Sequence, residues 1–189
     1  MARPVAVLDA NVLYPARVRD LLLRLAIAGH YRALWTERIL DECFSNLLAD
    51  RPDLPAESLH RTRGLMNVAV PDAIVRDYDH LIEQLDLPDP SDRHVLAAAI
   101  VSSADIVVTS NRGDFPAADV PPNITVLSPD DFILRLIHAD LESVATVIEQ
   151  QAAALRNPPM TTAELLDGLA IVGLHESVAV LRPATHEAL

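Results

Sequence analysis

Four acidic residues stand where a parallel sheet would bring their side chains together. Asp9 ends the apolar run of residues 5–8, and Asp114 lies in the polar loop that follows another apolar run. Asp92 opens an apolar helical segment, and Glu42 lies near the start of a helical segment that follows a short strand. Ligand sites of open parallel sheets lie beyond the carboxyl ends of the strands. We therefore expect the four carboxylates to share one rim of the sheet.

A cluster of this kind predicts chemistry that depends on a cation. Carboxylates placed close together raise one another's pKa unless a positive charge lies among them. Oxygen ligands without histidine or cysteine suit Mg²⁺ or Mn²⁺. Such ions activate water and stabilise the leaving oxygen during phosphoester hydrolysis, so the pattern favours that reaction.

Each acid alone also has an ordinary structural explanation. Asp9 could be a turn residue or a helix cap at the end of a strand, and Asp114 could simply form a turn. Asp92 would favour the dipole at a helix N-terminus, and Glu42 could be a surface glutamate beside Asp41. Only the combination of the four acids points to a site.

The elements that must position these acids alternate along the chain. Short apolar runs predict strands at residues 5–8, 30–35, 68–70, 105–110 and 124–127. Apolar residues at helical spacing predict helices at residues 16–28, 36–47, 57–66, 73–85, 92–102 and from 128 onward. Gly29, Thr36 and Ser91 are expected to cap helices. Strands separated by helices predict an α/β fold with a parallel sheet that is covered on both faces.

The last part of the chain has a different pattern. After about His138 no further strand is predicted, and the helical pattern is interrupted once by an Asn-Pro-Pro sequence. Thr161 and Glu164 then form a capping box that opens another helix. We predict a sheet domain at residues 1–137 and a helical C-terminal extension at residues 138–189.

The composition excludes several classes of protein. Half of the 189 residues are hydrophobic and only 4% are aromatic, which predicts an aliphatic core. All 15 basic residues are arginine, and the absence of lysine excludes a Walker A loop, a Schiff-base lysine and a Ser-x-x-Lys nucleophile. Cys43 is the only cysteine, which excludes a disulfide framework. No apolar run is long enough for a signal peptide core or a membrane span, so we expect a soluble cytoplasmic protein.

The charge limits how the chain could bind nucleic acid. The 27 acidic residues give a formal net charge of −12, whereas a protein that coats DNA is usually basic. A nucleic-acid partner therefore needs a local contact surface or bound cations. Arginines of the first third could contact phosphates, although each alone could equally be solvated helix surface. The candidates among them are Arg17, Arg19, Arg24, Arg32 and Arg38.

Three other side chains near the acids have competing interpretations. Tyr14 lies just past Asp9 and could stack on an RNA base, and Trp35 could do the same, although a single aromatic side chain is usually part of the core. His94 follows Asp92 closely, and we expect it to pack against the helix surface.

Each of the four acids lies in a sequence segment that resembles a motif of a known family. The segments are Leu8-Asp9-Ala10-Asn11-Val12-Leu13, Ile39-Leu40-Asp41-Glu42, Asp89-Pro90-Ser91-Asp92-Arg93-His94-Val95-Leu96-Ala97-Ala98-Ala99 and Val108-Thr109-Ser110-Asn111-Arg112-Gly113-Asp114-Phe115-Pro116. In this order they resemble the motifs of the PIN-domain nucleases, over roughly residues 5–131. The last two segments are the most specific for this family. The segment with Glu42 is the weakest match, because the adjacent Asp41 could also be the motif's acid.

The resemblance implies a fold, an activity and a set of site residues. The fold would be a three-layer α/β/α domain with a central parallel sheet, and the activity a metal-dependent endoribonuclease. One or two Mg²⁺ or Mn²⁺ ions would be bound by Asp9, Glu42, Asp92 and Asp114. Supporting hydrogen bonds would come from Asn11, Thr109 and Asn111, with Asp89 as a further acid near the site.

The resemblance also implies partners. Small bacterial PIN proteins are most often VapC-type toxins, which cleave RNA, are neutralised by an antitoxin encoded alongside them in a type II system, and are frequently dimeric. The extension at residues 138–189 departs from a minimal toxin. Contact within a homodimer and docking of the antitoxin are the two hypotheses for its role.

Two alternatives share parts of this pattern. A PIN-like scaffold that binds RNA or protein without cutting would be expected to have lost one or more acids, and this chain retains all four. A metal-dependent phosphatase or a DNA flap nuclease shares the metal chemistry. Flap nucleases, however, are longer and carry DNA-clamping helices and a basic surface that this sequence lacks.

Overall fold

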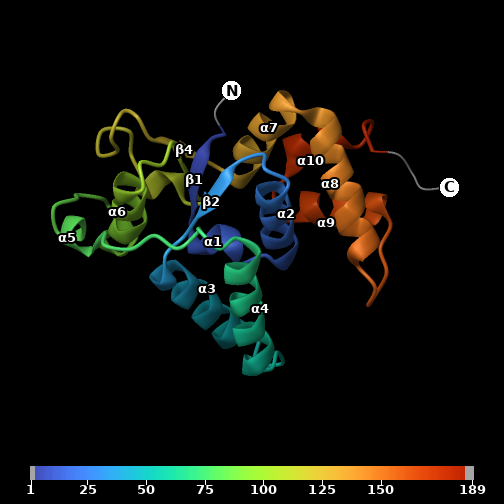
Figure 1. The fold of residues 1–189 in the computed structure, drawn as a ribbon, viewed down its shortest axis with the longest axis horizontal. Coiled ribbons are helices and arrows are strands. Elements are labelled where there is room, and N and C mark those ends of the chain that lie inside the picture. The colour runs from blue at the N-terminus through green and yellow to red at the C-terminus, as the bar shows by residue number, and fades with distance from the viewer. Residues whose placement is uncertain (1–2, 186–189) are drawn as a thin grey trace.

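A sheet of four parallel strands forms the centre of the protein, and Figure 1 shows it between layers of helices. The computed structural model describes residues 3–185. The strands are β1 (Val5–Leu8), β2 (Arg32–Leu34), β3 (Ile106–Val108) and β4 (Thr125–Leu127), in the spatial order β2-β1-β3-β4. In the register of the sheet, Val7 of β1 lies beside Leu34 and Val107. The predicted parallel sheet is confirmed, and the carboxyl ends of all four strands meet at one edge.

Helices cover both faces of this sheet. They are α1 (Ala10–Leu13), α2 (Ala16–Ile27), α3 (Glu37–Asp50), α4 (Ala56–Ala69), α5 (Asp79–Ile82), α6 (Arg93–Val101), α7 (Pro129–Ala139), α8 (Leu141–Ala154), α9 (Thr162–Ile171) and α10 (His175–Leu181). Helix α6 packs against β1 and β3, whereas α2 contacts β2 and α7 contacts β4. Figure 1 shows α6 on one side of the sheet and α2, α7 and α8 on the other. The predicted three-layer arrangement is confirmed.

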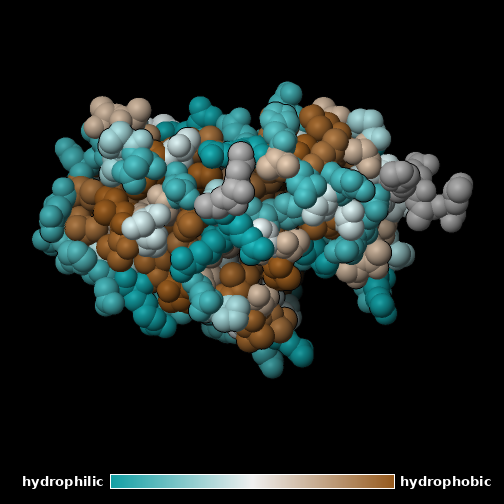
Figure 2. Space-filling view, turned by 45° about the horizontal axis from the view of Figure 1, so that its top comes forward, coloured by the Kyte–Doolittle hydropathy of each residue, from teal (hydrophilic) through white to brown (hydrophobic). Residues whose placement is uncertain are grey.

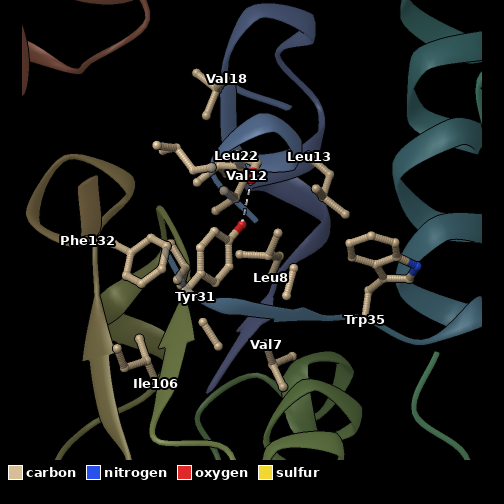
Figure 3. Close-up of a cluster of buried hydrophobic side chains, with 14 of the residues drawn as sticks. Val7, Leu8, Val12, Leu13, Val18, Leu22, Tyr31, Trp35, Ile106 and Phe132 are labelled. Atoms are coloured by element: carbon tan, nitrogen blue, oxygen red, sulfur yellow. Dashed lines mark hydrogen bonds between the residues drawn. The ribbon is translucent and has the colours of Figure 1, made fainter. Parts of the chain in front are cut away.

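The core between the sheet and α2 is aliphatic around one aromatic pair (Figure 3). The rings of Tyr31 and Phe132 meet edge to face, with centroids 4.9 Å apart and an interplanar angle of 84°. The Tyr31 hydroxyl donates a hydrogen bond of 3.0 Å to the carbonyl of Leu22. Burial raises the pKa of Tyr31, so the hydroxyl stays protonated as a donor. This pair joins α2, α7 and the start of β2 on one face of the sheet.

Two of the predicted caps hold the connection from α2 through β2 to α3. Gly29 has a φ of +85°, a conformation that side-chain-bearing residues rarely adopt, and it ends α2. The Thr36 hydroxyl accepts a hydrogen bond of 3.0 Å from the backbone N–H of Ile39 and starts α3. The two caps therefore set the direction in which α3 leaves the sheet.

Arg19 lies inside the protein and fastens α1 to its neighbours. Its side chain donates hydrogen bonds to the carbonyls of Leu13 (2.6 Å) and Tyr14 (3.2 Å), and the guanidinium lies 5.7 Å from the ring centre of Phe44 in α3. The residue is only 8% exposed. The hypothesis that Arg19 contacts phosphate is therefore wrong, because buried carbonyls at the end of α1 use its donors.

The predicted strand at residues 68–70 is also wrong. Helix α4 continues to Ala69, and the backbone N–H of Val70 still donates to the carbonyl of Met66 at 3.0 Å. Helical hydrogen bonding therefore outweighs the β-branched composition of this run until Pro71, which has no N–H to continue the pattern.

The predicted helix at residues 73–85 is replaced by an extended segment and a single helical turn. The N–H of Trp35 donates to the carbonyl of Ala73 at 2.9 Å, and the N–H of Val75 donates to the carbonyl of Trp35 at 2.8 Å. Only α5 is helical in this range. Backbone pairing with the residue that follows β2 therefore outweighs the helical periodicity.

The start of α6 differs from the prediction in one cap. The prediction that Ser91 caps the helix is wrong, because the N-cap residue of α6 is Asp92, which makes no side-chain cap hydrogen bond. The Asp89 carboxylate instead caps the turn before the helix, by accepting a hydrogen bond of 2.8 Å from the N–H of Ser91. Residues Pro90–Asp92 form a 3₁₀ turn, η1, and α6 begins at Arg93. A proline at the first position of the turn suits this geometry. The turn places Asp92 directly before α6.

The C-terminal helices pack against α2. The predicted capping box is confirmed: the Thr161 hydroxyl accepts from the N–H of Glu164, and the Glu164 carboxylate accepts from the N–H of Thr161. Helix α8 contacts α2, and the Gln151 side chain donates to the carbonyl of Arg17 at 3.0 Å. The boundary between residues 137 and 138 stays a prediction. Residues 1–2 and 186–189 of the two predicted ranges lie outside the described residues.

Helix α10 receives its N-terminal cap from α7. Its N-cap residue, Leu174, offers no side-chain cap. Instead the Asp130 carboxylate accepts hydrogen bonds from the N–H groups of Glu176 (2.8 Å) and Ser177 (2.9 Å). The Ser177 hydroxyl also donates to the Asp130 carbonyl at 3.1 Å. A negative charge at a helix N-terminus is favourable, so Asp130 joins the last helix to the sheet domain.

The surface is mixed in character. Figure 2 shows hydrophobic patches separated by hydrophilic side chains. Within residues 3–185, the exposed large hydrophobic side chains are Ile27, Leu65, Val68, Val101, Leu141, Ile171 and Val172. Among the described residues, the helices are too short or too polar to cross a membrane.

Replacing Asp130 tests the contact between α7 and α10. We expect Asp130→Ala to lower the free energy of unfolding by about 1–2 kcal/mol, because two N–H groups of α10 lose their acceptor. Urea denaturation followed by circular dichroism measures the change. Asp119→Ala, at an exposed acid in a loop, is the control and should change stability by less than about 0.5 kcal/mol. Equal stability of both variants and the wild type would refute the role of Asp130.

Candidate metal and nucleic-acid site

Asp9 lies at the carboxyl end of β1 and is almost fully buried. Its exposed fraction is 3%, and its backbone N–H continues the sheet by donating to the carbonyl of Val108 at 3.0 Å. One carboxylate oxygen accepts from the N–H of Ala10 at 2.6 Å. The other accepts from the Asn11 amide (2.6 Å) and the Thr109 hydroxyl (2.7 Å). The side chain is therefore fixed from both sides.

Asn11 and Thr109 tie the loops after β1 and β3 to each other. The Asn11 amide also donates to the Thr109 hydroxyl at 3.1 Å, and its carbonyl oxygen accepts from the N–H of Ser110 at 2.9 Å. The Thr109 hydroxyl accepts in turn from the N–H of Asn111 at 3.1 Å. These hydrogen bonds hold the two central strand ends together around Asp9.

The environment of Asp9 has opposing effects on the pKa of its carboxyl group. Burial raises the pKa of Asp9, whereas the hydrogen bonds from Thr109 and from the N–H of Ala10 lower it. The nearby charge of Glu42 raises the pKa further. The net shift is upward, so the folded protein holds this carboxylate in a position where a positive neighbour would stabilise it.

Helix α3 separates Glu42 from its acidic neighbour. Asp41 forms an ion pair with Arg63 of α4, and Arg63 also pairs with Glu37. Glu42 points the other way, into the cavity that contains Asp9. Of the two acids that the sequence leaves open, only Glu42 thus reaches the rim of the sheet.

Asp92 is the acid of this site whose pKa is strongly raised. Its pKa is raised to about 7, first by burial and then by the charges of Asp9, Asp89, Asp114 and Glu42. All four neighbours act in the same direction, so the five acids share one electrostatic environment. Such crowding is what a bound cation relieves.

These side chains open into one cavity of about 340 Å³. It is lined by Asp9, Ala10, Asn11, Tyr14, Glu42, Asn46, Asp50, Asp92 and Asn111. Two predicted acids lie outside this lining. Asp114 sits in the 3₁₀ turn η2 (Arg112–Asp114) and acts on Asp92 through its charge. Asp89 is exposed, and one of its oxygens is used by the N–H of Ser91.

The donor set suits a divalent ion, but the acids do not form a closed coordination shell. Within residues 3–185, no three His, Cys, Asp or Glu side chains stand in an arrangement that could hold a metal ion. The oxygen-only chemistry of Asp9, Glu42 and Asp92, with Asp114 nearby, fits Mg²⁺ or Mn²⁺. The fold brings the predicted acids within electrostatic range of one another, and a cation among them would relieve their mutual repulsion.

Three residues near the site were missed or underestimated from the sequence. His94 is 1% exposed, and its Nε2 lies 3.5 Å from a carboxylate oxygen of Glu42, so it does more than pack against a helix surface. Asn46 and Asp50 line the cavity beside Glu42. Their spacing of four residues along α3 was a signal that could have identified them, because such residues share one face of a helix.

The two aromatic residues considered for base stacking, Trp35 and Tyr14, lie in different environments. Trp35 is fully buried, and its ring nitrogen donates to the side-chain oxygen of Asn67 at 3.2 Å. The hypothesis that Trp35 stacks on an RNA base is therefore wrong. Tyr14 is half-buried and lines the cavity.

Comparison with known proteins assigns this fold to a class. The PIN domain family matches residues 5–113, more than half of the chain, and the chain belongs to this family. Residues 129–183 match a second family, described as the VapC50 C-terminal domain. Both matches agree with the predicted resemblance.

One curated relative gives the comparison at the level of a particular protein. The chain is 42% identical over 79 residues to "Putative ribonuclease VapC50" of Mycobacterium tuberculosis (strain ATCC 25618 / H37Rv). The aligned stretch covers 41% of this chain and 47% of the relative, so it spans about half of the relative's length. No solved structure matches the chain.

The raised pKa of Asp92 predicts how stability without metal depends on pH. Its folded-state pKa lies above that of the unfolded chain, so its contribution to stability is lost as the pH rises through about 7. In EDTA at pH 8, Asp92→Asn should therefore melt about 2–4 °C above the wild type, a range that allows for solvent screening of this partly exposed group. The difference should disappear by about pH 4.

Thermal unfolding between pH 4 and pH 8 measures this effect. Asp119→Asn, at an exposed loop acid, serves as the control and should follow the wild type throughout. A variant at Asp92 that is no more stable than the wild type at pH 8 would contradict the crowding of charge at this position.

Proposed function

We propose that the protein is a divalent-metal-dependent endoribonuclease that acts as the toxin of a type II toxin–antitoxin pair. The observation that carries the proposal is the buried Asp9 carboxylate beside Glu42 and Asp92 in one cavity. Membership of the PIN domain family and the similarity to "Putative ribonuclease VapC50" support the substrate and the reaction class.

The proposed ligands of Mg²⁺ or Mn²⁺ are Asp9, Glu42, Asp92 and Asp114. When bound, such an ion activates water and neutralises charge that develops on phosphate oxygens. Asp9 is held in place by Thr109 and Asn11, so little side-chain freedom remains to be lost on binding. The other three acids approach from α3, from η1 and from η2.

The supporting residues orient the acids. Asn11 and Thr109 donate to Asp9, and Thr109 also accepts from the backbone of Asn111, whose side chain lines the cavity. Asp89 raises the pKa of Asp92 through its charge while it caps the turn before α6. We assign Asp89 an electrostatic role and not a ligand role.

The proposed partners are RNA, a cognate antitoxin and a second copy of the chain in a homodimer, and the proposed compartment is the cytoplasm, where all three would be met. The match of residues 129–183 to the VapC50 C-terminal domain supports the toxin assignment. On α4, Leu65 and Val68 are 60% and 76% exposed, and they offer apolar surface to a protein partner.

One observation favours a second candidate, a PIN-like scaffold that binds RNA or protein without cutting. No three acidic side chains within residues 3–185 stand close enough to hold an ion. Loss of coordination would leave the fold and the cavity intact while it removed the reaction. A cleavage assay separates the two candidates.

The assay compares changes at two proposed metal ligands with a change at Asp41, the residue next to Glu42 on α3. Purified full-length protein, free of any co-expressed antitoxin, is incubated with total RNA and Mg²⁺ or Mn²⁺. We expect cleavage that is abolished by EDTA and is reduced by about a hundredfold or more in Asp9→Asn and Glu42→Gln, because each change removes a proposed metal ligand. Asp41→Asn, whose carboxylate pairs with Arg63 away from the cavity, should retain wild-type activity.

Two outcomes would contradict the proposal. Cleavage that persists in Asp9→Asn would show that the site lies elsewhere or that a contaminating nuclease is responsible. A folded wild-type protein that cleaves no RNA with either metal would favour the scaffold.

A further inference from the structure

The cavity continues past the proposed metal ligands along one face of α3. Glu42, Asn46 and Asp50 line it at intervals of four residues. Asn11 of α1 and Tyr14, which directly follows α1, line it from the other side. With a rise of 1.5 Å per residue, Glu42 and Asp50 are separated by about 12 Å along the helix axis. This length is comparable to one nucleotide, measured from its phosphate to the far edge of its base.

Tyr14 is held rigidly at the far end of the cavity. Its hydroxyl donates a hydrogen bond of 2.8 Å to the Asp50 carboxylate, and its carbonyl accepts from buried Arg19 at 3.2 Å. The ring itself is half-buried and lines the cavity. An aromatic ring that is already fixed loses little conformational freedom when a flat ligand stacks on it.

Asn46 stands between Tyr14 and the acids with its polar atoms available. The residue is exposed, and its amide takes part in no hydrogen bond within the part of the chain that the structure describes. An amide offers two donors and an acceptor, the functional groups that recognise a ribose hydroxyl or the edge of a base.

We propose that Tyr14 and Asn46 form a subsite for one unpaired ribonucleotide beside the reacting phosphate. Tyr14 stacks on the base, Asn46 hydrogen-bonds to the sugar or the base edge, and Asp50 keeps the Tyr14 ring in place. The proposal rests on the proposed function for the nature of the substrate. It adds that the base must be unstacked from its neighbours, so single-stranded RNA is preferred over a duplex.

The charges of the cavity support this occupant over a free anion. Asp50 lies at one end and Asp9, Glu42 and Asp92 lie at the other, so an isolated phosphate would be repelled from both ends. A nucleotide places its phosphate only at the end where a cation would neutralise the acids. Its neutral base then occupies the part lined by Tyr14 and Asn46.

Binding of a labelled oligoribonucleotide tests the subsite separately from cleavage. The probe is a short fluorescent single strand of mixed sequence, titrated with full-length Asp9→Asn protein in Mn²⁺ and followed by anisotropy. In this background we expect Tyr14→Ala to weaken binding by about five- to a hundredfold, the range for loss of one base-stacking contact. Tyr14→Phe keeps the ring and should bind within about threefold of its parent.

Asn46→Ala is the second variant and should weaken binding by about three- to tenfold through loss of a hydrogen bond. Its matched control is Ser45→Ala, because Ser45 is next to it on α3 but lines a separate groove with Asp41 and Arg63. The control should bind like its parent. A duplex of the same sequence should compete at least about tenfold less well than the single strand.

The outcomes separate the subsite from the nuclease assignment. Unchanged binding in both Tyr14→Ala and Asn46→Ala would overturn the subsite even if the wild type cleaves RNA. Equal losses of affinity in Tyr14→Phe and Tyr14→Ala would overturn stacking. Both variants lose the hydrogen bond to Asp50, but only Tyr14→Ala loses the ring. The predicted pattern in a protein that cuts no RNA would support the subsite and refute the nuclease. Melting curves show whether each variant is folded. If Tyr14→Ala unfolds, Asn46→Ala still tests the subsite, because Asn46 is exposed and its replacement should not unfold the protein.

Discussion

The position of the Asp9 carboxylate at the end of the central strand is the constraint on which the rest of the site depends. A carboxylate removed from water is unfavourable unless hydrogen bonds or a positive charge compensate for the lost solvation. Thr109, Asn11 and the N–H of Ala10 supply three hydrogen bonds, yet the pKa of Asp9 is still raised. The compensation inside the protein is therefore incomplete, and a cation would complete it.

The same constraint explains how the surrounding elements are arranged. Because Asn11 and Thr109 both bond to Asp9, the loops after β1 and β3 are fixed to each other at the edge of the sheet. Arg19 then anchors the end of α1, which places Tyr14 against α3. The side of α3 that faces Asp9 carries Glu42, whereas Asp41 is turned toward Arg63. The end of β1 thus organises a site whose other acids are carried by a helix and two 3₁₀ turns.

Much of this arrangement follows from sequence patterns that reflect local physics. Short apolar runs predicted all four strands of the sheet, and the order of elements predicted its parallel direction. The positions of Asp9 and Asp92 at the ends of predicted elements were enough to place them on one rim. The metal ligation and the roles of the individual acids stay predictions, because they depend on a cation and on a reaction.

The errors lie where long-range contacts outweigh local pattern. Residues 73–85 have helical periodicity, but pairing with Trp35 keeps their start extended. The burial of Arg19 and of His94 depends on helices that are distant in sequence from one another, so neither could be read from neighbouring residues. The cap that Asp130 provides for α10 joins positions more than forty residues apart and has no local signal.

We expect the acids around Asp9 to bind a divalent cation together. Calorimetric titration of the full-length protein with Mn²⁺ at pH 8 measures this directly, independently of any RNA. We expect saturable binding by the wild type and by Asp41→Asn, and binding weakened by about tenfold or more in Asp9→Asn and in Asp92→Asn. Binding that is absent from the wild type, or that is equally strong in all four proteins, would contradict it.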